Sequence, residues 1–185
     1  GHDHACGLRQ DGTPECWGNT DYAQNFVPDG TFASLTAGRH HVCGLRDSGS
    51  AECWGSLNTA PSDTFEALSS GGFHICGLRP DGSAECWGDD VHGQSSALAG
   101  PFVALSAGAN HSCGLRTDGS AECWGLDYHG QSSPLAGTFI VLSAGGSHTC
   151  GLLTDGSAEC WGWDVHGQSS PPSGTFVALA AGEHP

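Results

Sequence analysis

The sequence contains no lysine, and its only strongly basic side chains are five arginines. Against 20 aspartate and glutamate residues, they leave a formal net charge of −15 at pH 7. Surfaces that bind phosphate are basic, so this charge argues against DNA, RNA or an anionic membrane as a partner. No apolar run approaches the roughly 18 residues of a membrane-spanning helix, so we expect no membrane insertion. No secretory leader is visible, and a leader removed before Gly1 is compatible with the sequence.

Signatures of catalysis are also missing. The sequence has no Gly-x-Ser-x-Gly motif, phosphate-binding loop, His-Glu-x-x-His motif or dinucleotide fingerprint. Carboxylates are plentiful, but each recurs with the repeat described below or lies in a predicted turn, whereas a catalytic pair should interrupt a repeat. We therefore predict that the protein is not an enzyme and uses no cofactor.

An internal repeat dominates the chain. The segment Cys-Gly-Leu, a turn, and Glu-Cys-Trp-Gly occurs five times, and the spacings between the glycines that open successive units are 37, 33, 37, 37 and 37 residues. These opening glycines are Gly1, Gly38, Gly71, Gly108, Gly145 and Gly182. Periods of this length are typical of solenoids and propellers. We expect residues 1–185 to form a single repeat domain, with units that start near 1, 38, 71, 108 and 145.

Each unit contains a β-hairpin whose turn sets the strand register. Asp-Gly or Ser-Gly in the turn favours a type I turn followed by a glycine bulge. In the third unit this register pairs Cys76 with Cys86, with Cα atoms about 4.5 Å apart, within the range of a disulfide. We predict five such disulfides, Cys6–Cys16, Cys43–Cys53, Cys76–Cys86, Cys113–Cys123 and Cys150–Cys160. Disulfides indicate an oxidising compartment, so we expect an extracellular or cell-surface protein.

A third strand precedes most hairpins. The run Phe139–Leu142 is apolar on both faces, which predicts a strand buried between neighbouring sheets. Similar runs begin at Phe32, Phe65, Phe102 and Phe176. The pattern predicts an all-β, propeller-like array of five three-stranded units with a disulfide in each hairpin.

The repeated string Ala-Gly-x-x-His-x-Cys-Gly-Leu-Arg-x-Asp-Gly-Ser-Ala-Glu-Cys-Trp-Gly-x-Asp-x-His-Gly-Gln resembles the regulator of chromosome condensation repeat. It also resembles the related seven-bladed β-lactamase inhibitor protein of propeller type, and it matches the short, cysteine-bearing repeats of secreted bacterial members. The resemblance implies a β-propeller, and known members usually have seven blades. The nuclear member is a nucleotide-exchange factor that binds chromatin, and an acidic, disulfide-bonded chain fits neither role.

The two ends of the sequence complement each other. The first hairpin has no Phe-x-x-Leu strand before it, and the predicted strand 175–181 has no hairpin after it. Three interpretations are open: strand 175–181 completes the first unit within the chain, it completes the first unit of a neighbouring chain in a head-to-tail polymer, or the sequence is a segment of a longer array.

Histidines recur at two places in the unit. One series lies two residues before the first cysteine of each hairpin, at His4, His41, His74, His111 and His148, and His184 is grouped with it. We predict that these histidines satisfy backbone groups of a neighbouring unit, with metal binding or pH sensing as the alternative. The other lies in Asp-x-His-Gly-Gln loops, where we expect turn stabilisation by the aspartate rather than a metal site: His92, His129 and His166. Protonation of all 11 histidines between pH 7 and 5 would move the net charge from −15 toward roughly −4 and favour association.

Aromatic and imidazole side chains that interrupt the repeat are the candidate binding residues, namely Tyr22, Phe26, Tyr128, His129, Trp163 and His166. Packing between units is the alternative role for them. Asn110-His111-Ser112 is a glycosylation sequon, so Asn110 is a candidate modification site. Together these features predict a non-enzymatic extracellular scaffold, structural or protein-binding, with itself among its partners. The alternative is a secreted inhibitor or a lectin-like glycan binder that uses its loops.

Overall fold

The computed structural model describes residues 1–182, and all of its regular secondary structure is β. The strands are β1 (His4–Leu8), β2 (Pro14–Gly18), β3 (Ser34–Ala37), β4 (His41–Leu45), β5 (Ala51–Gly55), β6 (Ala67–Ser70), β7 (His74–Leu78), β8 (Ala84–Gly88), β9 (Phe102–Ala107), β10 (His111–Arg116), β11 (Ala121–Gly125), β12 (Phe139–Ala144), β13 (His148–Leu153) and β14 (Ala158–Gly162). No helix in the described part of the chain is long and apolar enough to cross a membrane.

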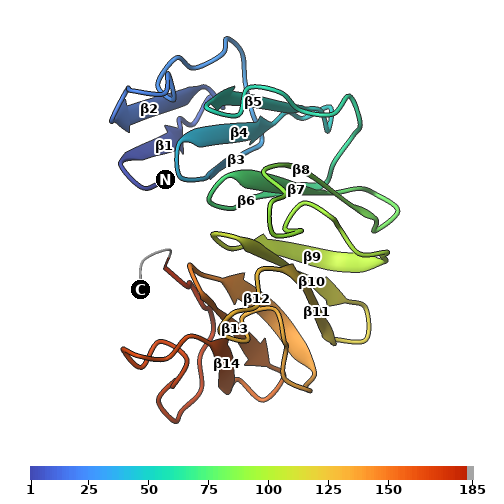
Figure 1. The fold of residues 1–185 in the computed structure, drawn as a ribbon. Coiled ribbons are helices and arrows are strands. Elements are labelled where there is room, and N and C mark those ends of the chain that lie inside the picture. The colour runs from blue at the N-terminus through green and yellow to red at the C-terminus, as the bar shows by residue number, and fades with distance from the viewer. Residues whose placement is uncertain (183–185) are drawn as a thin grey trace.

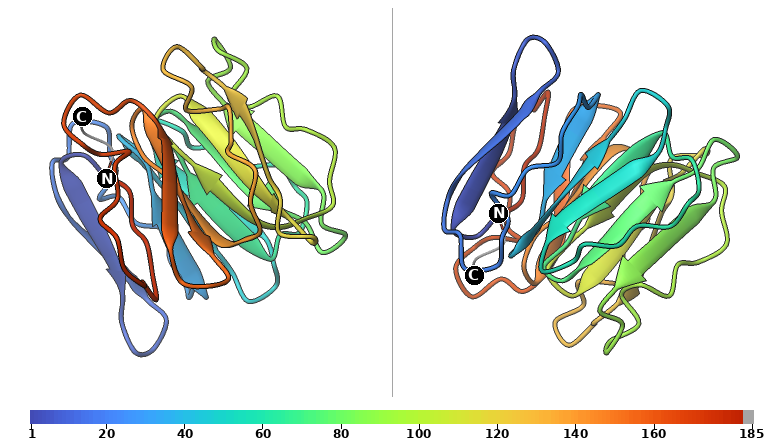
Figure 2. Two further views of the ribbon diagram at one scale, coloured as in Figure 1. Left: turned by 90° about the horizontal axis from the view of Figure 1, so that it is seen from below. Right: turned by 90° about the horizontal axis from the view of Figure 1, so that it is seen from above.

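The strands form five antiparallel sheets, one for each repeat. The first sheet has only β1 and β2, and each of the other four has three strands. The sheets follow one another along an arc that is open between β1–β2 and the last residues of the described chain (Figure 1). Both views of Figure 2 show the blue β1–β2 hairpin and the dark red segment that ends at residue 182 on the same side of the molecule. This is the predicted propeller-like array.

The hairpin register is the one predicted from the turn. Cys76 lies opposite Cys86, Gly77 opposite Glu85 and Leu78 opposite Ala84. All five disulfides form within their own hairpins, with Cα atoms 4.0 to 4.1 Å apart. Gly82 has a φ of 80°, which gives glycine the left-handed conformation that the bulge needs. The short-range turn chemistry therefore sets the covalent cross-links of the fold.

The first strands of the three-stranded sheets, β3, β6, β9 and β12, are called the inner strands. The phenylalanine at or just before the start of each one is buried, with 2 to 3% of its surface exposed. The expectation that these strands are buried on both faces is wrong, because Val103 and Ile140 are half exposed. Neighbouring side chains of a strand point to opposite faces. Because Phe102 and Phe139 point into the space between the sheets, the next residues, Val103 and Ile140, point away from it.

Residues 175–181 do not complete the first unit within this chain. They form no strand, and they lie beside the fifth sheet, where the amide of Phe176 donates to the carbonyl of Gly156 (2.7 Å) and that of Ala181 to Ser143 Oγ (2.8 Å). Equivalent pairs of bonds link β6, β9 and β12 to the preceding unit, as Phe139 to Gly119 and Ala144 to Ser106. The segment therefore holds the place of a sixth inner strand, which keeps it away from β1. Completion of a neighbouring chain stays a prediction.

Candidate functional site: the loop face

One face of the array is built from two kinds of loop and is called the loop face. It consists of the turns that precede the recurrent histidines, at 38–40, 71–73, 108–110 and 145–147, and of the loops at 19–24, 89–94, 126–131 and 163–168. Backbone hydrogen bonds tie the two kinds together, because the amide of Asp89 donates to the carbonyl of Phe73 (2.9 Å) and the amide of Trp163 to that of Ser147 (2.8 Å). The loops are therefore held at defined positions by the sheets beneath them.

The Asp-x-His-Gly-Gln loops are shaped by their aspartate and glutamine. The carboxylate of Asp90 accepts hydrogen bonds from the Ser95 amide and the Ser96 hydroxyl, both at 2.7 Å. The Ser96 hydroxyl bond is the main cause that lowers the pKa of Asp90. Gln94 is fully buried, and its Oε1 accepts from the His92 amide (2.8 Å). The polar groups of these loops thus hold the loop itself, and among the described residues no group of three or more His, Cys, Asp or Glu is placed to hold a metal ion.

A continuous row of aromatic side chains crosses the loop face over the first three units. Tyr22 stacks on His40 with ring centroids 4.2 Å apart, His40 contacts Phe73 at 5.8 Å, and the guanidinium of Arg39 lies 5.7 Å from the Phe73 ring centroid. Tyr22 and Phe73 are still 47% and 38% exposed. We call these four residues the aromatic ledge.

Of the four ledge residues, only Tyr22 is among the binding residues predicted from the sequence. Arg39, His40 and Phe73 are not among them. The signal was present, because the two positions before the recurrent histidine vary from unit to unit while the rest of the turn repeats. Residues at positions that vary between units are not required to form the repeated unit.

A second cluster lies on the last two units. His129 stacks on Trp163 with centroids 5.4 Å apart, and Trp163 contacts His166 at 6.0 Å. The structure therefore brings three of the predicted residues together. Phe26 and Tyr128 are exposed and belong to neither cluster.

The arginines outside the ledge are occupied within their own hairpins. Arg9, Arg46, Arg79 and Arg116 each form an ion pair with the glutamate six residues later, as the sequence pattern predicts. Arg39 is the one arginine of the chain that is not part of such a hairpin pair. The cation of the aromatic ledge, Arg39, is therefore not part of the repeated Arg–Glu ion pairs.

The first histidine series is buried behind the loop face. His41, His74 and His111 are fully buried, and burial lowers their pKa to about 3, 4 and 4 respectively. The ring nitrogen Nε2 of His74 bonds Ser112 Oγ (2.7 Å), and that of His111 bonds Thr149 Oγ1 (2.8 Å). His74 and His111 therefore link neighbouring units as neutral groups, through side-chain hydroxyls and not through the backbone groups that were predicted. Neither ring nitrogen of His41 has a hydrogen-bond partner among the described residues. The expected charge change of all 11 histidines between pH 7 and 5 is wrong for these three. His184 lies outside the described residues.

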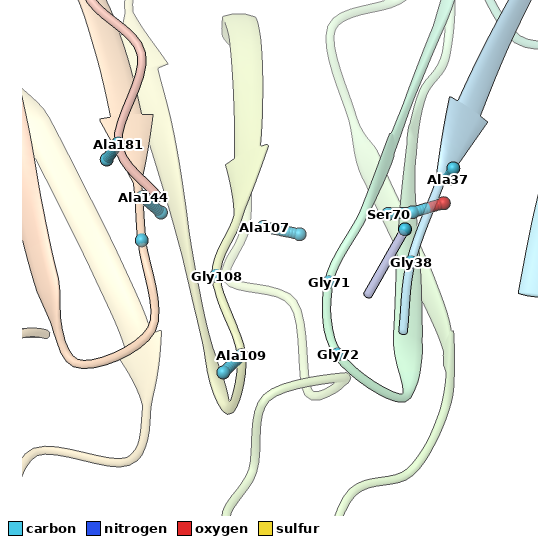
Figure 3. Close-up of a pocket in the computed structure, with 12 residues that line it drawn as sticks. Ala37, Gly38, Ser70, Gly71, Gly72, Ala107, Gly108, Ala109, Ala144 and Ala181 are labelled. Carbon is cyan, nitrogen blue, oxygen red and sulfur yellow. The ribbon is translucent and has the colours of Figure 1, made fainter. Parts of the chain in front are cut away.

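An axial pocket of about 240 Å³ lies where the inner strands converge. Glycine and alanine line it almost entirely, and its walls come from every unit, from Ala37 and Gly38 round to Ala144 and Ala181 (Figure 3). Within residues 1–182, no charged side chain lines it.

The sequon residue Asn110 lies in a loop-face turn. It is partly buried, its carbonyl accepts from the Leu126 amide (2.9 Å), and the following His111 and Ser112 are buried. Glycosylation of Asn110 stays a prediction.

Comparisons with known proteins match the repeat and the fold. The family model for the regulator of chromosome condensation (RCC1) repeat matches residues 65–94, 102–131 and 139–168. Among solved structures, the chain is 33% identical to the entire ectodomain of the Physcomitrella patens receptor kinase CR4, with a TM-score of 0.84 over 98% of this chain and 54% of that one. It is 30% identical to the CRINKLY WD40 ectodomain of the Arabidopsis thaliana receptor kinase ACR4, with a TM-score of 0.81 over 98% of this chain and 71% of that one.

Other similarities concern the fold alone. Yeast RCC1 (Prp20), in a crystal structure with Kap60, is 18% identical, with a TM-score of 0.75 over 91% of this chain and 55% of that one. No curated protein sequence matches the chain significantly. The chain spans about half the length of the Physcomitrella patens CR4 ectodomain that it matches.

Proposed function

Because this chain belongs to the RCC1 repeat family, whose propeller fold serves many functions, we propose its role from its own surface: a non-enzymatic extracellular or cell-surface scaffold that binds a partner protein through the aromatic ledge. Five disulfides and the similarity to two receptor ectodomains support an oxidising extracellular environment.

The exposed ledge is the observation that carries this proposal. Residues that a repeat needs for folding recur in each unit, whereas Tyr22, His40 and Phe73 interrupt the repeat and still contact one another across three units. Tyrosine, phenylalanine and arginine are enriched at protein interfaces, where rigid rings bury a large area at low entropic cost. An aromatic row left partly open to water is therefore better suited to a partner than to the stability of the array.

Two further observations support a binding role over a catalytic one. Four of the five hairpin glutamates form ion pairs within their own units, as Glu85 does with Arg79. Four turn aspartates accept hydrogen bonds within their own turns, as Asp81 does from Ser83. Among the described residues, the lining of the axial pocket consists of glycine and alanine together with Ser70.

Affinity capture with matched variants tests the proposal. The chain, fixed to a support, is exposed to the surface and secreted fractions of cells that produce it, and bound proteins are cross-linked and mapped. Tyr22→Ala combined with Phe73→Ala should reduce the captured partner at least about tenfold, the effect of losing an interface hot spot. Val103→Ala, an exposed residue outside the loop face, should leave capture unchanged. Equal capture by the ledge variant and the wild type contradicts the proposal.

A glycan is the second candidate ligand, and the His129–Trp163–His166 cluster supports it. A partly exposed indole flanked by imidazoles offers a flat apolar surface with polar edges. Binding to a glycan array that Trp163→Ala abolishes and the ledge variant retains would favour this role.

A further inference from the structure

Loops of the loop face cover the unit that follows them in the chain. Loop 19–24 packs on the second unit, where the carbonyl of Gln24 accepts a hydrogen bond from Trp54 Nε1 (2.8 Å). The equivalent bonds on the fourth and fifth units run from Trp124 to Gln94 and from Trp161 to Gln131, both at 3.0 Å. These three tryptophans are 5 to 6% exposed. The loop of one unit thus buries the hairpin tryptophan of the next.

The third unit has no such loop over it. The linker 56–64 of the second unit has 9 residues, whereas the equivalent linker 89–101 has 13 and contains the Asp-x-His-Gly-Gln sequence. Trp87 of the third unit is only partly buried, and Gly88 after it is exposed. Trp87 Nε1 has no hydrogen-bond partner among the described residues. The position that a loop occupies on the second, fourth and fifth units is therefore open on the third.

Phe73 lies at this open position. It corresponds to His40, because each of them directly precedes a recurrent histidine. On the second unit, Tyr22 of the covering loop stacks on His40 with ring centroids 4.2 Å apart. On the third unit nothing in the linker 56–64 replaces Tyr22, because this linker contains no aromatic or imidazole side chain. Phe73 is left 38% exposed, so a ring from another molecule can stack on it as Tyr22 stacks on His40.

Arg39 supplies a cation at the same place. Its guanidinium lies 5.7 Å from the centroid of the Phe73 ring, and its backbone amide donates to the carbonyl of Gly72 (3.1 Å). Its side chain forms no ion pair or hydrogen bond with the described residues, and Asp3 nearby bonds His2 instead (2.8 Å). An arginine fork of this kind suits a carboxylate, which it binds through two parallel hydrogen bonds.

We propose that the open position on the third unit receives a turn of the partner protein that presents an aromatic side chain next to an aspartate or glutamate. The aromatic ring stacks on Phe73, and the carboxylate pairs with Arg39. This inference rests on the proposed function, since it states what the partner of the aromatic ledge carries.

The repeat and its charge favour this occupant. A peptide turn, loop 19–24, fills the equivalent position on the second unit, which favours a peptide turn over an acidic glycan on the third. The net charge of −15 repels an acidic protein as a whole, so the carboxylate belongs to an otherwise neutral or basic surface.

Separate variants remove the charge, the ring and the open position. Arg39→Gln removes the cation, and Phe73→Ala removes the ring. In a loop-graft variant, a copy of residues 89–101 replaces residues 56–64 and covers the third unit as loops cover its neighbours. Arg9→Gln is the matched control, because Arg9 is exposed and pairs with Glu15 in the first hairpin, away from the ledge. Circular dichroism and thermal unfolding should show every variant to be folded.

Selection from a phage library of disulfide-closed peptides with short random loops supplies the probe. The wild type should enrich loops that carry an aromatic residue beside aspartate or glutamate. In fluorescence anisotropy with a synthetic enriched peptide, Arg39→Gln and Phe73→Ala should each bind about 10- to 100-fold more weakly, the loop-graft variant should not bind, and Arg9→Gln should bind like the wild type. Changing the carboxylate of the peptide to an amide should weaken binding to the wild type but not to Arg39→Gln.

A selection that enriches no loops of this kind, or an enriched peptide that binds Arg39→Gln as tightly as the wild type, overturns the inference. The affinity capture described above separates its failure from that of the proposed function. Capture that falls in the combined Tyr22→Ala and Phe73→Ala variant but not in Arg39→Gln leaves the ledge as the binding site and overturns the carboxylate. Equal capture by all variants contradicts both.

Discussion

The buried hydroxyl of Thr149 should be worth a measurable part of the stability of the array. His111 Nε2 lies 2.8 Å from Thr149 Oγ1, which in turn donates to the carbonyl of Gln131 at 3.1 Å. Because the hydroxyl proton points to that carbonyl, the imidazole N–H donates to the hydroxyl oxygen. Valine has nearly the same shape as threonine but no hydroxyl, so Thr149→Val leaves this N–H without a partner in a site with 0% exposure. Such a loss costs about 1–3 kcal/mol, which in a chain of this size lowers Tm by roughly 2–10 °C.

The first two units offer the reverse experiment. Val42 stands where Thr149 stands in the fifth unit, 38 residues after His4 and 18 after Gln24. Neither ring nitrogen of His4 has a hydrogen-bond partner within residues 1–182. Val42→Thr should supply one, with Gln24 accepting from the new hydroxyl, and should leave the free energy of unfolding unchanged or raise it by up to about 1 kcal/mol.

Urea unfolding at pH 7.5, followed by tryptophan fluorescence with the disulfides intact, measures both changes. Thr149→Ser removes the methyl group and keeps the hydroxyl, as Ser112 does at this position in the fourth unit, so it serves as the control variant that retains both hydrogen bonds. A Thr149→Val variant as stable as the wild type, or a Val42→Thr variant destabilised as much as Thr149→Val, contradicts this role of the hydroxyl.

Three other outcomes are expected. The free energy of unfolding should fall between pH 7 and pH 4.5 by roughly 2–3 kcal/mol for each fully buried histidine such as His74. The reason is that the unfolded imidazole, with a pKa near 6.5, binds a proton in this range, whereas the folded imidazole, with a pKa of about 4, does not. Constant stability in urea titrations across this range contradicts the prediction. Gly44→Ala should destabilise the chain by about 1–3 kcal/mol through its clash with Phe32, while Gly7→Ala should be near neutral in thermal unfolding. Peptide mapping without reductant should link every cysteine to the one ten residues away, and any bridge between units contradicts the register.

The parts of the structure that were predictable depend on residues close together in the chain. The turn at Asp81-Gly82 sets the pairing of Cys76 with Cys86, and the same chemistry recurs in each unit, so one correct hairpin implies five. The Arg–Glu pairs follow from the same register. The aromatic ledge was only partly predictable, because its members come from three units and their contacts depend on how neighbouring sheets pack.

The sequence by itself determined the all-β repeat, the hairpin register, the five disulfides and the acidic surface, since each follows from local turn chemistry or from composition. Contacts between residues of different units were decided only by the tertiary structure. It placed His111 against Thr149, gathered Tyr22, His40 and Phe73 into one row, and left segment 175–182 beside the fifth sheet instead of on β1. The physical reason is that the angle between successive sheets is set by close packing of side chains such as Phe102 and Phe139 between them, and this angle, accumulated over five units, determines whether the ends of the arc meet.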